Sequence, residues 1–207
     1  PAGSLGAYVR AVRGAVRGLV GVGRPPGFPF NLNSAVDKLL KKEFDLHRAA
    51  NTKHPLMEHY GVDAVPFRHE KMDEWRENFK GVQFLHEPTN FLVTGAVDDI
   101  LINPKKELHV VDYKATSTDS EISMDSEYRE GYKRQMEIYQ WLLRRNGFVV
   151  SSTGYFVYAN GKKDRKAFDG KLEFDVMILP YEGNDAWVEK TIFAAHACLA
   201  APAMPEA

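Results

Sequence analysis

The most constraining feature of this sequence is a pair of apolar, strand-like segments that carry charged residues. Residues 107–116 read ELHVVDYKAT, and residues 90–103 read NFLVTGAVDDILIN. Valine, isoleucine, threonine and aromatic residues favour strands. Because side chains alternate between the faces of a strand, Asp112 and Lys114 share one face and Tyr113 lies on the other. Charged groups are costly to bury unless they pair or bind a metal, so these charges point to a site.

The second segment supplies another carboxylate for that site. Asp98 and Asp99 are adjacent, so alternation places one acid on each face. The turn at residues 103–106 predicts an antiparallel hairpin, which brings Asp98 and Asp112 to the same end. Two carboxylates on neighbouring strands favour a magnesium site, and a lysine beside them can stabilise negative charge on a phosphodiester. The pattern therefore predicts metal-assisted hydrolysis of a phosphodiester.

The Asp-x-Lys spelling is weak evidence when it stands alone. It occurs again at Asp164/Lys166 and at Asp169/Lys171, where no apolar strand precedes it, so we interpret both copies as solvated surface. For Asp112 and Lys114 the alternative is a structural ion pair at a strand end. For Asp98 the alternative is an ordinary surface acid.

Helices are expected before, between and after the strands. The predicted elements are a helix over Ser34–His47 with a possible capping box at Ser34 and Asp37, a short helix over 72–79, strands over 81–86, 91–102 and 108–115, a polar loop over 116–126, a helix over 126–146 with Tyr128, Tyr132, Gln135, Tyr139 and Leu143 on one face, strands over 148–159 and 172–179 separated by a turn at 160–161, and a helix over 184–200. This order predicts an α/β fold with a mixed central β-sheet flanked by helices.

Three motifs resemble those of the PD-(D/E)XK nuclease superfamily. They are Gly95-Ala96-Val97-Asp98, Val110-Val111-Asp112-Tyr113-Lys114 and Gln135-x-x-x-Tyr139, in that order. More narrowly, they resemble RecB-type nuclease domains and the related CRISPR-adaptation exonucleases, over about residues 34 to 160. The resemblance implies a restriction-endonuclease-like core. It implies these site residues: Asp98, Asp112 and the backbone carbonyl of Tyr113 as metal ligands, Lys114 as the catalytic lysine, and Gln135 and Tyr139 as residues that position the substrate.

The sequence departs from that clade in two respects. Members often carry a histidine metal ligand on the first helix, but no histidine precedes His47 in the comparable helix here. Asp37 and Glu43 are the candidates to replace it, although helix capping is the stronger interpretation of Asp37. Many relatives also bind an iron–sulfur cluster through four cysteines. The single cysteine, Cys198, cannot support such a cluster.

Charge and composition bound the domain organisation and the partners. The net charge of −1 argues against a protein that simply coats DNA. Residues 1–30 contain four arginines and no acid, which predicts a basic Gly/Ala/Arg-rich arm, and residues 31–207 are predicted to form one domain. No apolar run is long enough to span a membrane. One cysteine favours a reducing, cytoplasmic location.

The leading hypothesis is a Mg²⁺- or Mn²⁺-dependent deoxyribonuclease that acts on single-stranded DNA or DNA ends, as an exonuclease of the kind used in DNA repair. The alternative is a nuclease-like module that binds nucleic acid or a protein without cutting. A third hypothesis is a phosphohydrolase acting on nucleotides, which the lack of a phosphate-binding glycine loop disfavours. The sequence indicates no particular protein partner.

Overall fold

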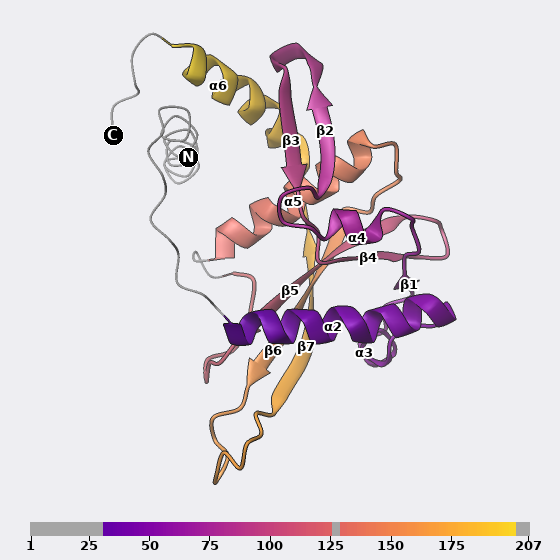
Figure 1. Cartoon of the computed structure of the whole chain (residues 1–207), viewed down its shortest axis with the longest axis vertical. Helices are drawn as coiled ribbons and strands as arrows, with labels where there is room; N and C mark the ends of the chain where they lie inside the picture. The colour runs from indigo at the N-terminus through magenta and orange to yellow at the C-terminus, as the bar shows by residue number, and fades with distance from the viewer. Residues whose placement is uncertain (1–30, 126–128, 202–207) are drawn as a thin grey trace. The chain divides into compact units, whose positions relative to one another are not determined.

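The computed structural model describes residues 31–125 and 129–201 (Figure 1). The predicted basic arm of residues 1–30 and the predicted start of the long helix at residues 126–128, including Tyr128, lie outside these ranges. The chain divides into two compact units. The larger unit comprises Phe30–Leu85 and Leu92–Asp185, and it contains every residue assigned to the site by the sequence.

The larger unit is built on a mixed five-stranded sheet, as predicted. Its strand order is β1-β4-β5-β6-β7, and only the central pair β5–β6 is parallel. A separate two-stranded sheet pairs β2 with β3. The elements are α2 (Asn31–Ala50), α3 (Pro55–His59), β1 (Val65–Pro66), α4 (Met72–Trp75), β2 (Val82–His86), β3 (Phe91–Gly95), β4 (Asp99–Ile102), β5 (Leu108–Thr116), α5 (Glu130–Arg145), β6 (Thr153–Gly161) and β7 (Phe174–Glu182).

Helix α2 covers one face of this sheet, where it lies across the central strands (Figure 1). Its buried residues Leu40 and Phe44 pack in one cluster with Val111 and Tyr113 of β5 and Val157 of β6. Burial of each such side chain contributes about 1.5–3 kcal/mol. This cluster fixes α2 against the strand that carries the Asp-x-Lys motif.

Helix α5 packs on β5 and presents its own apolar side chains inward. Met136, Leu142 and Leu143 are fully buried, and Met136 and Leu143, seven residues apart, share one face of the helix. A Cβ added at Gly95, at the end of β3, would lie only 2.7 Å from the Tyr139 ring. The glycine of the G-x-x-D motif is therefore required by the close approach of α5.

The prediction of one continuous strand over residues 91–102 is wrong. It is broken at Ala96–Asp98 into β3 and β4, which belong to different sheets. The break arises because the amide of Val97 donates to the carbonyl of Trp75 at 3.0 Å, and so leaves the strand ladder. The following hairpin is as predicted, with Asp99 opposite Val111 in antiparallel register. Extending that register by one residue brings Asp98 beside Asp112.

Other boundaries also differ from the sequence prediction. Helix α2 includes Asn31 to Ser34, so Ser34 lies inside the helix and is not its N-cap. The segment expected to turn at residues 160–161 continues β6, because Gly161 still pairs with Phe174 of β7. The short helix α3 and strand β1 were not predicted. Both are too short to show a recognisable periodicity.

The described part of the smaller unit comprises residues 86–91 and 186–201. It contains the 3₁₀ turn η1 (Glu87–Thr89) and helix α6 (Val188–Ala200), and a second turn η3 (Asp185–Trp187) leads into α6. His86 bonds Glu189 at 3.3 Å and packs edge-on against Phe193 of α6. No helix among the described residues is long and apolar enough to cross a membrane.

Candidate active site

Asp112 is the most deeply buried carboxylate of the motif residues. It lies in β5, is 1 % exposed, and forms an ion pair with Lys114 on the same face of the strand. Neither of its carboxylate oxygens accepts a hydrogen bond of good geometry from the described residues. A buried polar atom without such a partner is rare and requires an explanation.

The electrostatic environment of Asp112 opposes its ionisation. Burial raises the pKa of Asp112 to about 7; the Lys114 ammonium opposes this rise, and the nearby Asp98 carboxylate adds to it. A divalent cation would reverse this penalty by pairing with both carboxylates. Asp112 pairs with Lys114, but neither of its oxygens accepts a hydrogen bond from the described residues, and this oxygen-rich donor set fits a hard cation.

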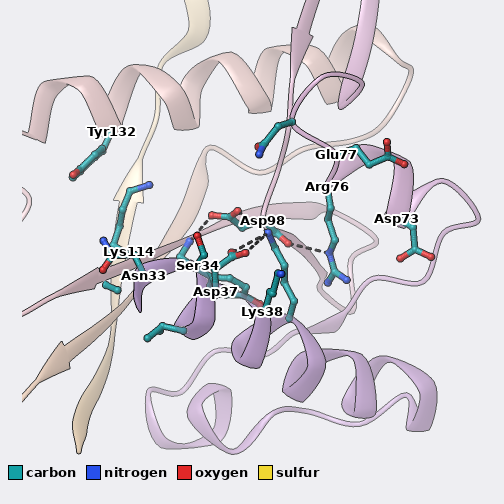
Figure 2. A pocket seen from close by; sticks show the side chains of 15 residues that line it. Asn33, Ser34, Asp37, Lys38, Asp73, Arg76, Glu77, Asp98, Lys114 and Tyr132 are labelled. Atoms are coloured by element: carbon teal, nitrogen blue, oxygen red, sulfur yellow. Dashed lines mark hydrogen bonds and ion pairs between the residues drawn. The ribbon is translucent and has the colours of Figure 1, made fainter. Parts of the chain in front are cut away.

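Asp98 is held between β3 and β4 by contacts to three separate segments. Its Oδ2 accepts the amide of Tyr113 at 2.9 Å, and its Oδ1 accepts Lys41 Nζ at 3.2 Å. Arg76 Nε donates to its backbone carbonyl at 3.0 Å (Figure 2). The side chain keeps 24 % of its surface exposed and lines a cleft. Asp98 is therefore both fixed in orientation and accessible.

The adjacent acid, Asp99, has a different environment. It is completely buried, not a surface acid, and it pairs with Arg48 and with Arg76 Nη2, the latter at 2.8 Å. It also accepts the hydroxyl of Tyr113 at 2.9 Å. Asp99 is thus neutralised within the protein, and Asp98 is the acid of this pair that faces the cleft.

Helix α2 brings Asp37 next to Asp98 through a lysine. Lys41 Nζ lies 2.9 Å from Asp37 Oδ1 and 3.2 Å from Asp98 Oδ1. Glu43 instead bonds the buried ring of His54 at 3.0 Å and does not line the cleft. Of the two carboxylates considered as additional ligands, Asp37 lies in the cleft with Asp98 and Glu43 does not.

The cleft beside these residues has a volume of about 590 Å³ and is drawn in Figure 2. That volume lies in the range of pockets that hold small ligands. Its lining residues are Asn33, Ser34, Val36, Asp37, Lys38, Lys41, Asp73, Arg76, Glu77, Asn78, Asp98, Tyr113, Lys114, Ala115 and Tyr132. The cationic groups in this lining can attract a phosphate backbone.

Gln135 and Tyr139 form a pair on α5, one helical turn apart. Gln135 Nε2 donates to the hydroxyl of Tyr139 at 2.6 Å. Burial raises the pKa of Tyr139 to about 12; the Gln135 bond opposes the rise, and the Asp112 charge contributes to it. Tyr139 packs against Gly95, so the pair supports the segment that leads to Asp98. Neither residue lines the cleft.

Three cleft residues were not singled out by the sequence. Tyr132, on α5, places its ring 4.5 Å from Lys114 Nζ, and it was expected only as part of an aromatic helix face. Lys41 could have been noticed from its i+4 spacing to Asp37. Arg76 follows a short helix and had no sequence signal. Each of the three reaches the motif residues only through tertiary packing.

The side-chain donors for a metal are few. No group of three or more His, Cys, Asp or Glu side chains arranged to hold an ion occurs within residues 31–125 and 129–201. Asp98 and Asp112 are the two carboxylates that converge. Any further protein donor must therefore be a backbone oxygen, such as that of Tyr113, or Asp37 after its ion pair with Lys41 opens.

A match to a known protein family spans nearly the whole chain. A family model described as the PD-(D/E)XK nuclease superfamily matches residues 11–203. A search of curated proteins gave no match to this sequence. The matched range includes both carboxylates, Lys114 and the Gln135/Tyr139 pair.

Proposed function

Because this chain belongs to the PD-(D/E)XK nuclease superfamily, we propose that it is a metal-dependent deoxyribonuclease that hydrolyses DNA phosphodiester bonds. One observation carries the proposal. Asp112 is buried with both oxygens lacking a hydrogen bond from the described residues, beside Asp98 and the Lys114 ammonium. Two neighbouring carboxylates, one of them buried, are unfavourable unless positive charge balances them. Their oxygen atoms are also the ligands that a divalent cation prefers, so the arrangement suits a metal site.

Each residue has a distinct proposed role. Asp98, Asp112 and the backbone carbonyl of Tyr113 would hold Mg²⁺ or Mn²⁺, which when bound supplies positive charge to the scissile phosphate. The Lys114 ammonium stabilises the negative charge that develops on the phosphate oxygens. Lys38 and Arg76 line the cleft beside them and would attract the DNA backbone.

The α5 pair has a positioning role in this proposal. Gln135 fixes the Tyr139 hydroxyl, and the Tyr139 ring packs on Gly95, three residues before Asp98. Small displacements of a catalytic group reduce rates strongly. Gln135 and Tyr139 therefore hold the Asp98 segment, and through it the DNA strand, in place for the reaction.

The finer features of the enzyme are also proposals. The exposed ring of Tyr132 next to Lys114 supports a single-stranded or end-directed substrate, because an unpaired base can stack on an aromatic face. We further propose an exonuclease of RecB type that acts in DNA repair in the cytoplasm, with residues 31–207 as its nuclease domain. Asp37 is the candidate for an additional ligand, and no iron–sulfur cluster is included.

The test is a cleavage assay on labelled single-stranded and duplex oligonucleotides with Mg²⁺, Mn²⁺ or EDTA. Lys114→Ala should lose at least about a hundredfold in rate, as is usual for loss of an electrostatic catalytic group. Lys166→Ala is the matched control, because it alters the same Asp-x-Lys spelling on an exposed turn and should leave the rate unchanged. Absence of cleavage with both metals, or full activity of Lys114→Ala, would refute the mechanism.

A second candidate is a nuclease-like module that binds DNA without cutting it. It is favoured by the lack of a third clustered carboxylate or histidine in the described part of the chain. Titration of the protein with Mn²⁺ in a calorimeter separates the two candidates. A nuclease shows binding that Asp112→Asn removes, whereas a binding-only module shows no such site.

A further inference from the structure

Lys41 occupies the space between two carboxylates of the cleft. It projects from α2, its side chain is 20 % exposed, and its Nζ lies within 3.2 Å of both Asp37 and Asp98. These two ion pairs fix the ammonium group in place between the carboxylates.

Lys41 neutralises part of the negative charge of the carboxylates at the site. Three ion pairs join Lys41 to Asp37 and Asp98, which line the cleft, and Lys114 to the buried Asp112, so this set of three carboxylates and two ammonium groups carries one net negative charge. The guanidinium of Arg76 does not alter this balance, since it pairs with the carboxylates of a separate network. One divalent cation together with one phosphodiester charge then gives a neutral assembly.

A second divalent cation would leave the site with two excess positive charges. Like charges held this close together repel strongly near a protein surface, so this excess opposes a second ion. Binding a second ion would also require the Asp37–Lys41–Asp98 contacts to break, because Lys41 already uses these carboxylate oxygens.

We propose that Lys41 supplies the positive charge that a second metal ion would otherwise provide, so that the site binds one divalent cation per chain. The inference rests on the proposed metal site at Asp98 and Asp112. Lys41 is a positioning residue in this proposal. Its charge holds Asp98 in place, and it also forms an ion pair with Asp37, one turn away on α2.

The experiment measures Mn²⁺ stoichiometry in the full-length protein, by calorimetry and by electron paramagnetic resonance of the free ion. The wild type should bind one Mn²⁺ per chain. Lys41→Met keeps the length and removes the charge, and it should bind two. Lys41→Arg should bind one Mn²⁺ per chain. The double variant Lys41→Met/Asp37→Asn should also bind one Mn²⁺ per chain, in contrast to the two expected for Lys41→Met alone. Lys42→Met is the control, because Lys42 lies on the same helix, is exposed and does not line the cleft.

The outcomes separate this inference from the proposed function. Two ions in the wild type, or one ion in a folded Lys41→Met protein, would overturn the role of Lys41 and leave the nuclease proposal intact. No ion in the wild type, with no cleavage, would overturn both. Circular dichroism establishes that each variant is folded, and the wild-type stoichiometry remains decisive if Lys41→Met does not fold.

Discussion

At the scale of single residues, Asp112 shows how a functional group can oppose stability. Its burial raises the pKa to about 7, well above the ordinary value of 3.8. In the metal-free protein the folded state therefore binds a proton that the unfolded state has released between these pH values. Stability from this group is present at low pH and is lost as pH rises from about 4 to 7.

This linkage predicts that Asp112→Asn stabilises the metal-free protein at pH 8 by about 2 kcal/mol or more and has little effect at pH 4. Asparagine is neutral at both pH values, so it removes the cost of a buried charge only where that charge exists. Urea unfolding in EDTA at the two pH values measures the difference. Equal effects at pH 4 and pH 8 would contradict the assignment.

The same carboxyl predicts a pH dependence of metal binding. Below about pH 7 a cation must displace the proton of Asp112, so the apparent Mn²⁺ affinity should fall by up to tenfold per pH unit. Calorimetric titrations between pH 5.5 and 8 provide the measurement. An affinity that stays constant across this range would show that Asp112 is not a ligand.

The neighbouring acids Asp98 and Asp99 should give opposite phenotypes. Asp99 is fully buried between two arginines, and loss of one partner from such a network costs about 3–5 kcal/mol. Asp99→Ala should therefore unfold at lower urea concentration. Asp98→Ala should change stability much less, because Asp98 is partly exposed, but should abolish cleavage. A comparable loss of stability in both variants would refute this division.

At the scale of secondary structure elements, the contact between β3 and α5 couples fold to site. Gly95 is the point of closest approach, and a methyl group there would meet both Tyr139 and Leu142. The strand ends immediately afterwards, and the released segment carries Asp98. Packing of α5 therefore sets where the Asp98 carboxylate lies.

This contact predicts that Gly95→Ala destabilises the protein by about 1–3 kcal/mol, the usual cost of overpacking, and lowers the cleavage rate. In a Tyr139→Ala background the ring is absent, so Gly95→Ala should lower the free energy of unfolding substantially less. A double-mutant cycle of unfolding free energies measures this coupling. Strictly additive effects would show that the ring does not make the contact.

At the scale of the whole molecule, the net charge of −1 means that the DNA binding we propose must come from a local surface. Four basic side chains line the cleft together with four acidic ones, and the basic ones are the candidate phosphate contacts: Lys38, Lys41, Arg76 and Lys114. About three phosphate contacts would lower single-strand affinity about tenfold or more between 50 and 200 mM salt. Fluorescence anisotropy of a labelled oligonucleotide in EDTA tests this, and a salt-independent affinity would contradict it.

The features that depend on neighbouring residues could be predicted from the amino-acid sequence. Alternation along β5 placed Asp112 and Lys114 on one face, the turn after β4 set the antiparallel hairpin, and helical spacing joined Gln135 to Tyr139. These follow from short-range geometry of strands, turns and helices. The three motifs in order also indicated the superfamily that the family comparison confirmed.

Which charged side chains form ion pairs could not be predicted from the sequence, because it depends on the packing of distant segments. The ion pairs of Lys41 with Asp98 and of Arg48 with Asp99 join residues 57 and 51 positions apart. They exist because α2 packs across the sheet on Phe44, which no local pattern specifies. The position of Asp37, rather than Glu43, beside the cleft follows from the same packing, whereas the break at Ala96–Asp98 follows from the hydrogen bond between Val97 and Trp75. Electrostatic contacts act through space, whereas sequence patterns record only distance along the chain.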